Sequence, residues 1–288
     1  MSDQEPKLYE YHDYHAEATV LQGHLTLPLV QEIQKQAHSQ LPEEGGYISQ
    51  QANDYRLEGV ISYKSAYTQV AGNPGSKEEH KWSTLATSVV EGLNIMDVVT
   101  ADRIVAQVSL DHPPQGYIPY ITFLGTRFEN LQIAGHRVEP SMALDLFGVR
   151  PKDDDTPYSK FSWFRNKVAA QQTEVLKHPN LLKELIERYT GFSRPIEKVE
   201  NSEAVECSLV NQADGGSRST SRGHVIHVPD FGTICLARVR LEQSDPSPTT
   251  SVPRRTKVHL HMLDLHMGCV AAGKATVGGL TTNGMTRP

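Results

Sequence analysis

The stretch Ile104-Val105-Ala106-Gln107-Val108-Ser109-Leu110 decides the fold class, because apolar and polar side chains alternate along it. Alternation with a period of two is typical of a β-strand that buries one face. The same pattern recurs at residues 86–90 and 236–241. It predicts a mainly β protein with antiparallel sheets in a sandwich or barrel-like arrangement. Turn-forming clusters separate such segments at residues 45–46, 72–75, 113–116, 214–217 and 283–284.

A helical pattern interrupts the strands at residues 158–190. Pro179 falls where a second helix would begin, Gly191 is a natural stop, and the acidic run at residues 153–155 would favour the positive end of the first helix. The sequence therefore predicts an inserted segment of two helices. Its apolar residues recur near helical spacing, first at Phe161, Phe164, Val168 and Val175, and then at Leu181, Leu182, Leu185, Ile186 and Tyr189.

The helical segment divides the chain into three parts. These are an N-terminal β region at residues 1–150, a helical connector at 151–200 and a C-terminal β region at 201–288. A chain of 288 residues is near the size at which one hydrophobic core stops growing, so one continuous domain is the alternative. Residues 243–256 are rich in serine, threonine and proline and are expected to form a long exposed loop.

Charge and hydropathy exclude two classes of partner. The formal net charge is -6 and the basic residues are scattered, so we expect no nucleic acid to bind. The longest apolar runs are only a few residues, far below the roughly 20 that span a bilayer, so we expect no membrane insertion.

The compartment is expected to be the cytoplasm. The N-terminus has no basic and apolar secretory signal, although export by a non-classical route stays open as an alternative. Three cysteines, Cys207, Cys235 and Cys269, are too few and too far apart for a disulfide framework, which also favours a reducing compartment.

A possible metal site lies in the segment Val258-His259-Leu260-His261-Met262. Two histidines separated by one residue on a strand project from the same face and can bind one divalent transition metal, with His227 as a further candidate ligand. No glutamate follows at a cupin-like spacing, and His266, five residues after His261, is expected on the opposite face. The favoured interpretation is that both histidines occupy the polar face of an amphipathic strand and that the protein has no cofactor.

Other candidate motifs lack the residues or the surroundings that their chemistry requires. The run from Gly268 to Gly273-Lys274 begins like a phosphate-binding loop, but Ala275 replaces the required hydroxyl and a strand pattern follows where a helix is needed. Cys235 lies among apolar residues and is expected to be a small buried side chain. No pair of carboxylates has a defined separation, so no catalytic residue is assigned.

Residues 85–94, 98–102 and 128–135 together resemble the β-rich repeats of bacterial choice-of-anchor P family proteins. The resemblance covers about a sixth of the chain and rests on small residues such as Gly92, Ala101 and Gly135. It implies a structural role, since the family supplies no catalytic residues to carry over. Unlike members of that family, the chain is expected to have neither a signal peptide nor a recognisable anchor, which argues against a surface location.

The sequence as a whole favours a non-enzymatic structural or interaction protein that associates with itself through exposed strand edges. One alternative is a metal-dependent enzyme that uses His259 and His261 on a β scaffold. Another is a β-sandwich that binds a small ligand or a glycan through residues brought together only by folding.

Overall fold

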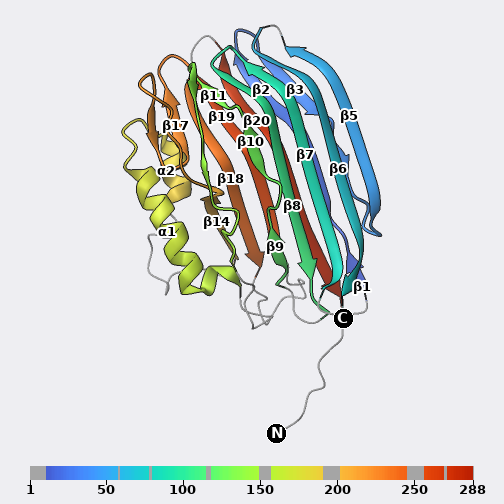
Figure 1. Cartoon of the computed structure of the whole chain (residues 1–288). Helices are drawn as coiled ribbons and strands as arrows, with labels where there is room; N and C mark the ends of the chain where they lie inside the picture. The colour runs from blue at the N-terminus through green and yellow to red at the C-terminus, as the bar shows by residue number, and fades with distance from the viewer. Residues whose placement is uncertain are drawn as a thin grey trace, which may run out of the picture.

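The computed structural model describes residues 11–57, 59–77, 80–114, 118–148, 157–190, 202–244, 256–268 and 271–287. Two antiparallel sheets of long strands lie face to face, and the helices lie beside one end of the larger sheet (Figure 1). The predicted antiparallel sandwich with an inserted two-helix segment is confirmed.

The larger sheet has ten strands and combines the two ends of the chain. Its main path begins with β16 (Thr220–Arg222), β17 (Val225–Val228), β18 (Gly232–Ser244) and β19 (Thr256–Gly268), and continues through β20 (Ala272–Arg287), β2 (Ala16–Leu27) and β3 (Gln31–Gln36). Three further strands pair beside this path, namely β1 (Tyr11–Asp13), β4 (Ser39–Gln40) and β14 (Ser202–Ser208).

The smaller sheet has eight strands, all from the first half of the chain. Its order is β12 (His136–Arg137), β11 (Gln132–Ile133), β8 (Val99–His112), β7 (His80–Ile95), β6 (Ile61–Lys77) and β5 (Gly46–Leu57), with β9 (Tyr120–Thr122) and β10 (Arg127–Glu129) also paired to β8. A separate two-stranded sheet joins β13 (Ser141–Met142) to β15 (Val210–Gln212).

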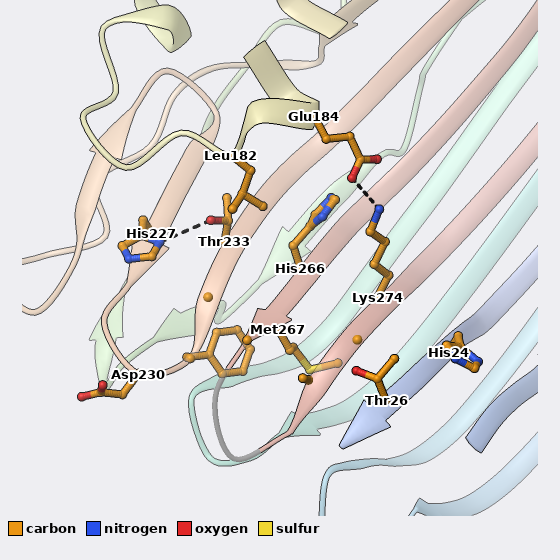
Figure 2. Close-up of a pocket in the computed structure, with 15 residues that line it drawn as sticks. His24, Thr26, Leu182, Glu184, His227, Asp230, Thr233, His266, Met267 and Lys274 are labelled. Carbon is orange, nitrogen blue, oxygen red and sulfur yellow. Dashed lines mark hydrogen bonds and ion pairs between the residues drawn. The ribbon is translucent and has the colours of Figure 1, made fainter. Parts of the chain in front are cut away.

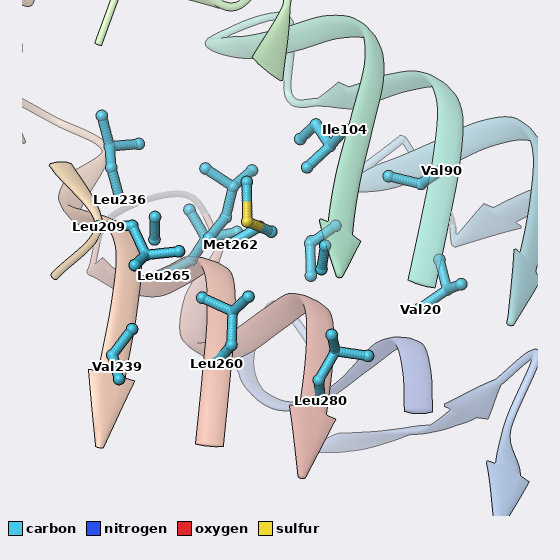
Figure 3. Close-up of a cluster of buried hydrophobic side chains, with 14 of the residues drawn as sticks. Val20, Val90, Ile104, Leu209, Leu236, Val239, Leu260, Met262, Leu265 and Leu280 are labelled. Atoms are coloured by element: carbon cyan, nitrogen blue, oxygen red, sulfur yellow. The ribbon is translucent and has the colours of Figure 1, made fainter. Parts of the chain in front are cut away.

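One hydrophobic cluster fills the space between the two sheets (Figure 3). Val20, Leu260 and Leu280 project from the larger sheet, and Val90 and Ile104 project from the smaller one. Each of these side chains has almost no solvent exposure, and burying one such side chain stabilises a fold by roughly 1.5–3 kcal/mol. The core therefore holds together strands from both of the predicted β regions.

The helical segment consists of η1 (Tyr158–Lys160), α1 (Ser162–Leu176) and α2 (Lys183–Tyr189). Phe164, Val168 and Val175 of α1 are fully buried, as their spacing predicts. Gln171 Nε2 donates to the backbone carbonyl of Ser208 at 3.0 Å, which fastens α1 to the outer side of β14. The acidic run at residues 153–155 and the stop at Gly191 lie outside the described residues.

Two predicted turns are wrong. Residues 72–75 lie inside β6, and residues 283–284 lie inside β20. A Cβ atom on Gly72 would lie 2.6 Å from the ring of Tyr14, and one on Gly284 would lie 2.4 Å from Nε2 of His12. Both glycines lie within a strand, where a neighbouring side chain packs directly on the backbone and leaves no room for a Cβ atom. They therefore serve close packing and do not mark turns.

The long strands switch the face toward which their side chains point. The pairing of β18 with β19 skips one residue on each strand, Ala237 and Met262, and then resumes. The pairing of β19 with β20 likewise skips Met262 and Gly278. Ala237 and Gly278 have φ values of 43° and 65°, and Gly92 on β7 of the smaller sheet has a φ of 63°. A left-handed residue within a strand reverses the alternation of side chains beyond it. Adjacent residues Met262 and Leu263 are consequently both buried in the core.

Candidate functional site

A row of side chains crosses the outer face of the larger sheet near α2. The strand register places His24 of β2 opposite Lys274 of β20, and Lys274 opposite His266 of β19. His266 in turn faces Thr233 of β18, which faces His227 of β17. Directly opposed residues on antiparallel strands have Cβ atoms about 5 Å apart, so these side chains from five strands form one continuous polar row.

A cavity of about 810 Å³ lies over this row (Figure 2). Leu182 and Glu184 of the α2 region form one wall, and the core residues Phe231 and Met267, each at most 5% exposed, also line it. Such a volume is within the range of small-molecule sites, about 300–1,000 Å³. The remaining lining residues are His24, Thr26, His227, Asp230, Gly232, Thr233, His266, Gly268, Ala272, Gly273 and Lys274.

Ion pairs attach the α2 wall to the sheet. The two carboxylate oxygens of Glu184 accept from different cations, Oε1 from Arg188 and Oε2 from Lys274. Arg188 also lies 3.6 Å from the carboxylate of Asp264 on β19. Tyr189, at the end of α2, is fully buried and bonds to Nε2 of His224 at 2.6 Å. The helix is thus held by charged groups at the cavity and by a buried hydrogen bond behind it.

Buried charges continue from α2 beneath the helices. Arg238 pairs with Asp264 and lies 3.2 Å from the carboxylate of Glu206. Burial raises the pKa of Glu206, and the nearby arginines only partly oppose this. Burial also acts to raise the pKa of Asp264, but interaction with His266 and Arg238 outweighs it and lowers that pKa below its ordinary value. Asp264 is therefore the anionic centre of this network at neutral pH.

His259 and His261 share the outer face of β19, as their spacing predicts. His259 Nδ1 is 3.0 Å from the Thr281 hydroxyl, and its Nε2 is 3.8 Å from the Glu242 carboxylate. Burial lowers the pKa of each histidine to about 4, and the positive charges of Lys257 beside His259 and Arg238 beside His261 add to the effect. Both imidazoles are therefore neutral at pH 7.

His227 does not lie beside the other two candidate ligands. It is level with His266, five residues along β19 from His261, and its Nδ1 is 3.3 Å from the Thr233 hydroxyl. Within the described ranges, no group of three or more histidine, cysteine, aspartate or glutamate side chains is arranged to hold a metal ion. The predicted metal site stays a hypothesis that lacks a third ligand.

The prediction that His266 lies on the opposite face from His261 is wrong. The face switch at Met262 falls between them, so Asp264 and His266 project outward with His261. Asp264 pairs with Arg238, which is the cross-strand partner of His261, and lies 3.8 Å from the His266 ring. A strict alternation of faces along β19 fails here because the pairing skips Met262, whose residue type gives no sign of an irregularity.

Two further sequence predictions can be compared with the structure. Cys235 is fully buried and burial raises the pKa of its thiol, which confirms a packing role, whereas Cys269 lies outside the described residues. Lys274 is on strand β20, so no helix follows the segment that resembles a phosphate-binding loop. Sequence reasoning missed Lys274 and His24 as cavity residues because only the pairing of β2 with β20 brings them together.

The edges of the sheets differ in length. The larger sheet ends at β16, with 3 residues, and at β3, with 6. The smaller sheet ends at β12, with 2 residues, and at β5, with 12. Nearly all of β5 is exposed or half-buried on both faces. Of these four edge strands, β5 is the longest.

Comparison with known proteins identifies a family of unknown function. A family model described as a domain of unknown function (DUF8256) matches residues 12–242, which include the smaller sheet, both helices and most of β18. No curated protein and no solved structure matches the chain. Within the described residues, no helix has the length and apolar character needed to cross a membrane. The resemblance to choice-of-anchor P proteins stays a prediction. The chain belongs to the DUF8256 family.

Proposed function

We propose that the protein is a non-enzymatic interaction protein that associates with itself through β5. The observation that carries this proposal is the length and exposure of that 12-residue edge strand, which among the described residues pairs with β6 on one side only. The outer side of an edge strand presents backbone N–H and C=O groups that can pair with another strand. A second copy of β5 would extend the eight-stranded sheet across the interface.

The composition of β5 also favours pairing with a copy of itself. Natural edge strands are commonly protected by proline, by clustered charge or by a bulge. β5 has no proline, and its only charged residues, Asp54 and Arg56, have opposite signs. Asp54 has a φ of 54°, which interrupts regular pairing near one end. We therefore expect residues 46–53 to form an antiparallel, two-fold symmetric contact that includes the exposed ring of Tyr47.

The proposal is tested by placing like charges on this edge. Ser49 and Gln51 are exposed and separated by one residue, so both side chains lie on the same face of β5. In a symmetric pair, Ser49→Lys/Gln51→Lys would bring four lysines together and repel the second copy. Light scattering coupled to size exclusion should show a dimer for the natural chain and a monomer for this variant.

A matched control adds the same charge elsewhere. Gln31 and Gln34 are exposed on the shorter edge strand β3, so Gln31→Lys/Gln34→Lys should leave the dimer intact. A natural chain that is monomeric at all concentrations would refute the proposal. It would also be refuted by a β5 variant that dimerises as well as the control.

A further inference from the structure

We propose that the cavity beside α2 binds a small amphipathic acid, a molecule with an apolar body and a carboxylate head group. This site lies on the outer face of the larger sheet, whereas β5 is an edge of the smaller one. The inference therefore goes beyond self-association and does not depend on it.

The wall of the cavity that Leu182 forms is suited to an apolar body. Leu182 approaches from the start of α2 (Figure 2), and Phe231 and Met267 also line the cavity, each at most 5% exposed. Leu182 is 38% exposed and lines the cavity. A ligand that covers this side chain removes apolar surface from water, at about 25 cal/mol for each Å².

The polar end offers donors for an acidic head group. Among the described residues, Lys274 is the only lysine or arginine that lines the cavity, and its cross-strand neighbours are His24 and His266. His266 is only 7% exposed, and its Nε2 lies 3.8 Å from the carboxylate of Asp264. A carboxylate placed beside Lys274, whose side chain is 58% exposed, would gain a charge-assisted hydrogen bond from its ammonium group.

Lys274 can receive a ligand without leaving its helix partner. Its ammonium group has three donors, and the structure shows it donating to Oε2 of Glu184. The other oxygen of Glu184 accepts from Arg188, so both oxygens of this carboxylate already have partners. Beside Lys274, donors of the ammonium group therefore remain for a ligand, whereas both oxygens of Glu184 are engaged. That balance favours an acid over a sugar, whose hydroxyl groups also need acceptors.

Calorimetric titration of the full chain tests the ligand class with three probes. Octanoate has both the apolar chain and the carboxylate head group. Octyl glucoside, used below its critical micelle concentration, has the same apolar chain with a neutral sugar head group. Acetate has the carboxylate with almost no apolar chain. We expect one octanoate site per chain, with octyl glucoside and acetate each at least tenfold weaker. Equal binding of octyl glucoside would refute the acidic head group, and failure of octanoate to bind would refute the site.

Two pairs of variants locate the binding. Lys274→Gln should weaken octanoate about tenfold or more, as expected for loss of a hydrogen bond to a charged group. Its control, Lys35→Gln, removes a comparable exposed ion pair with Glu17, away from the cavity, and should bind normally.

The second pair tests the apolar body. Leu182→Asn should weaken octanoate, whereas Ile186→Asn, on α2 just after Leu182 and 41% exposed, should not. Because all four side chains are partly exposed, the variants should fold. If a cavity variant and its control bound octanoate with equal affinity, binding would lie outside the cavity and the inference would be overturned. Normal binding by the β5 double-lysine variant would separate this site from self-association.

Discussion

At the scale of single residues, the outer face of the larger sheet concentrates buried charge. Arg238 lies between Asp264 and Glu206 with only 11% of its side chain exposed. A buried ion pair contributes little relative to apolar residues of the same shape, but removing one partner leaves an uncompensated charge. We therefore expect the network, which contacts α2 through Arg188 and Asp264, to orient the helix more than it adds to stability.

Arg238→Met should lower the free energy of unfolding by about 3–5 kcal/mol at pH 7, because two buried carboxylates lose their main counter-charge. Urea denaturation measures the change. Arg137→Met is the matched control, since Arg137 pairs with Glu139 while both are largely exposed, and we expect a change below about 0.5 kcal/mol. A similar small loss in both variants would mean that the network is solvated.

The buried histidines predict how stability depends on pH. The pKa of His259 and His261 falls from 6.5 to about 4 in the folded chain. Between these values the unfolded chain binds more protons, so stability is present above pH 6.5 and is lost as the pH falls toward 4. For His261, the shift corresponds to a contribution of up to about 3 kcal/mol.

Urea denaturation at pH 7.5, 5.5 and 4.5 should show this loss, and His261→Gln should flatten it. The control His136→Gln, at an exposed position on β12, should leave the pH dependence of stability unchanged. An unchanged slope in His261→Gln would show that this ring is not buried as a neutral group.

At the scale of elements, the sequence predicts strands and helices well but not their interruptions. Alternation identifies β8 and β18, and helical spacing identifies α1, because each pattern reports a local contact with one core. The face switch escapes prediction because Ala237 gives no sign of a left-handed conformation. The glycines in β6 and β20 indicate turns by composition, yet they serve close packing, which depends on distant residues.

Gly278→Ala tests the face switch. Gly278 has a φ of 65°, and a Cβ atom there would lie 3.0 Å from the side chain of Met262. We expect a loss of about 1–2 kcal/mol in the free energy of unfolding, from left-handed strain and crowding. The control is Gly268→Ala, at the end of β19, where a Cβ atom would meet nothing within 4 Å, and it should change stability little. Equal effects would contradict a strained strand at Gly278.

At the scale of the whole molecule, pairing between the two ends of the chain creates both the fold and the cavity. β2 lies beside β20, and this contact brings His24 to Lys274. No local pattern encodes it, so the sequence could indicate a strand at each end but not the row of side chains across them. The same architecture leaves β5 at the open edge of the smaller sheet.

Hydrogen exchange along β5 tests self-association most directly, because it reports the backbone groups that would pair. The account predicts that outward-facing amides within residues 46–53 are protected at high protein concentration and become exchangeable on dilution, while amides of the central strand β7 stay protected throughout. Exchange of the β5 amides that is fast and independent of concentration would contradict the account.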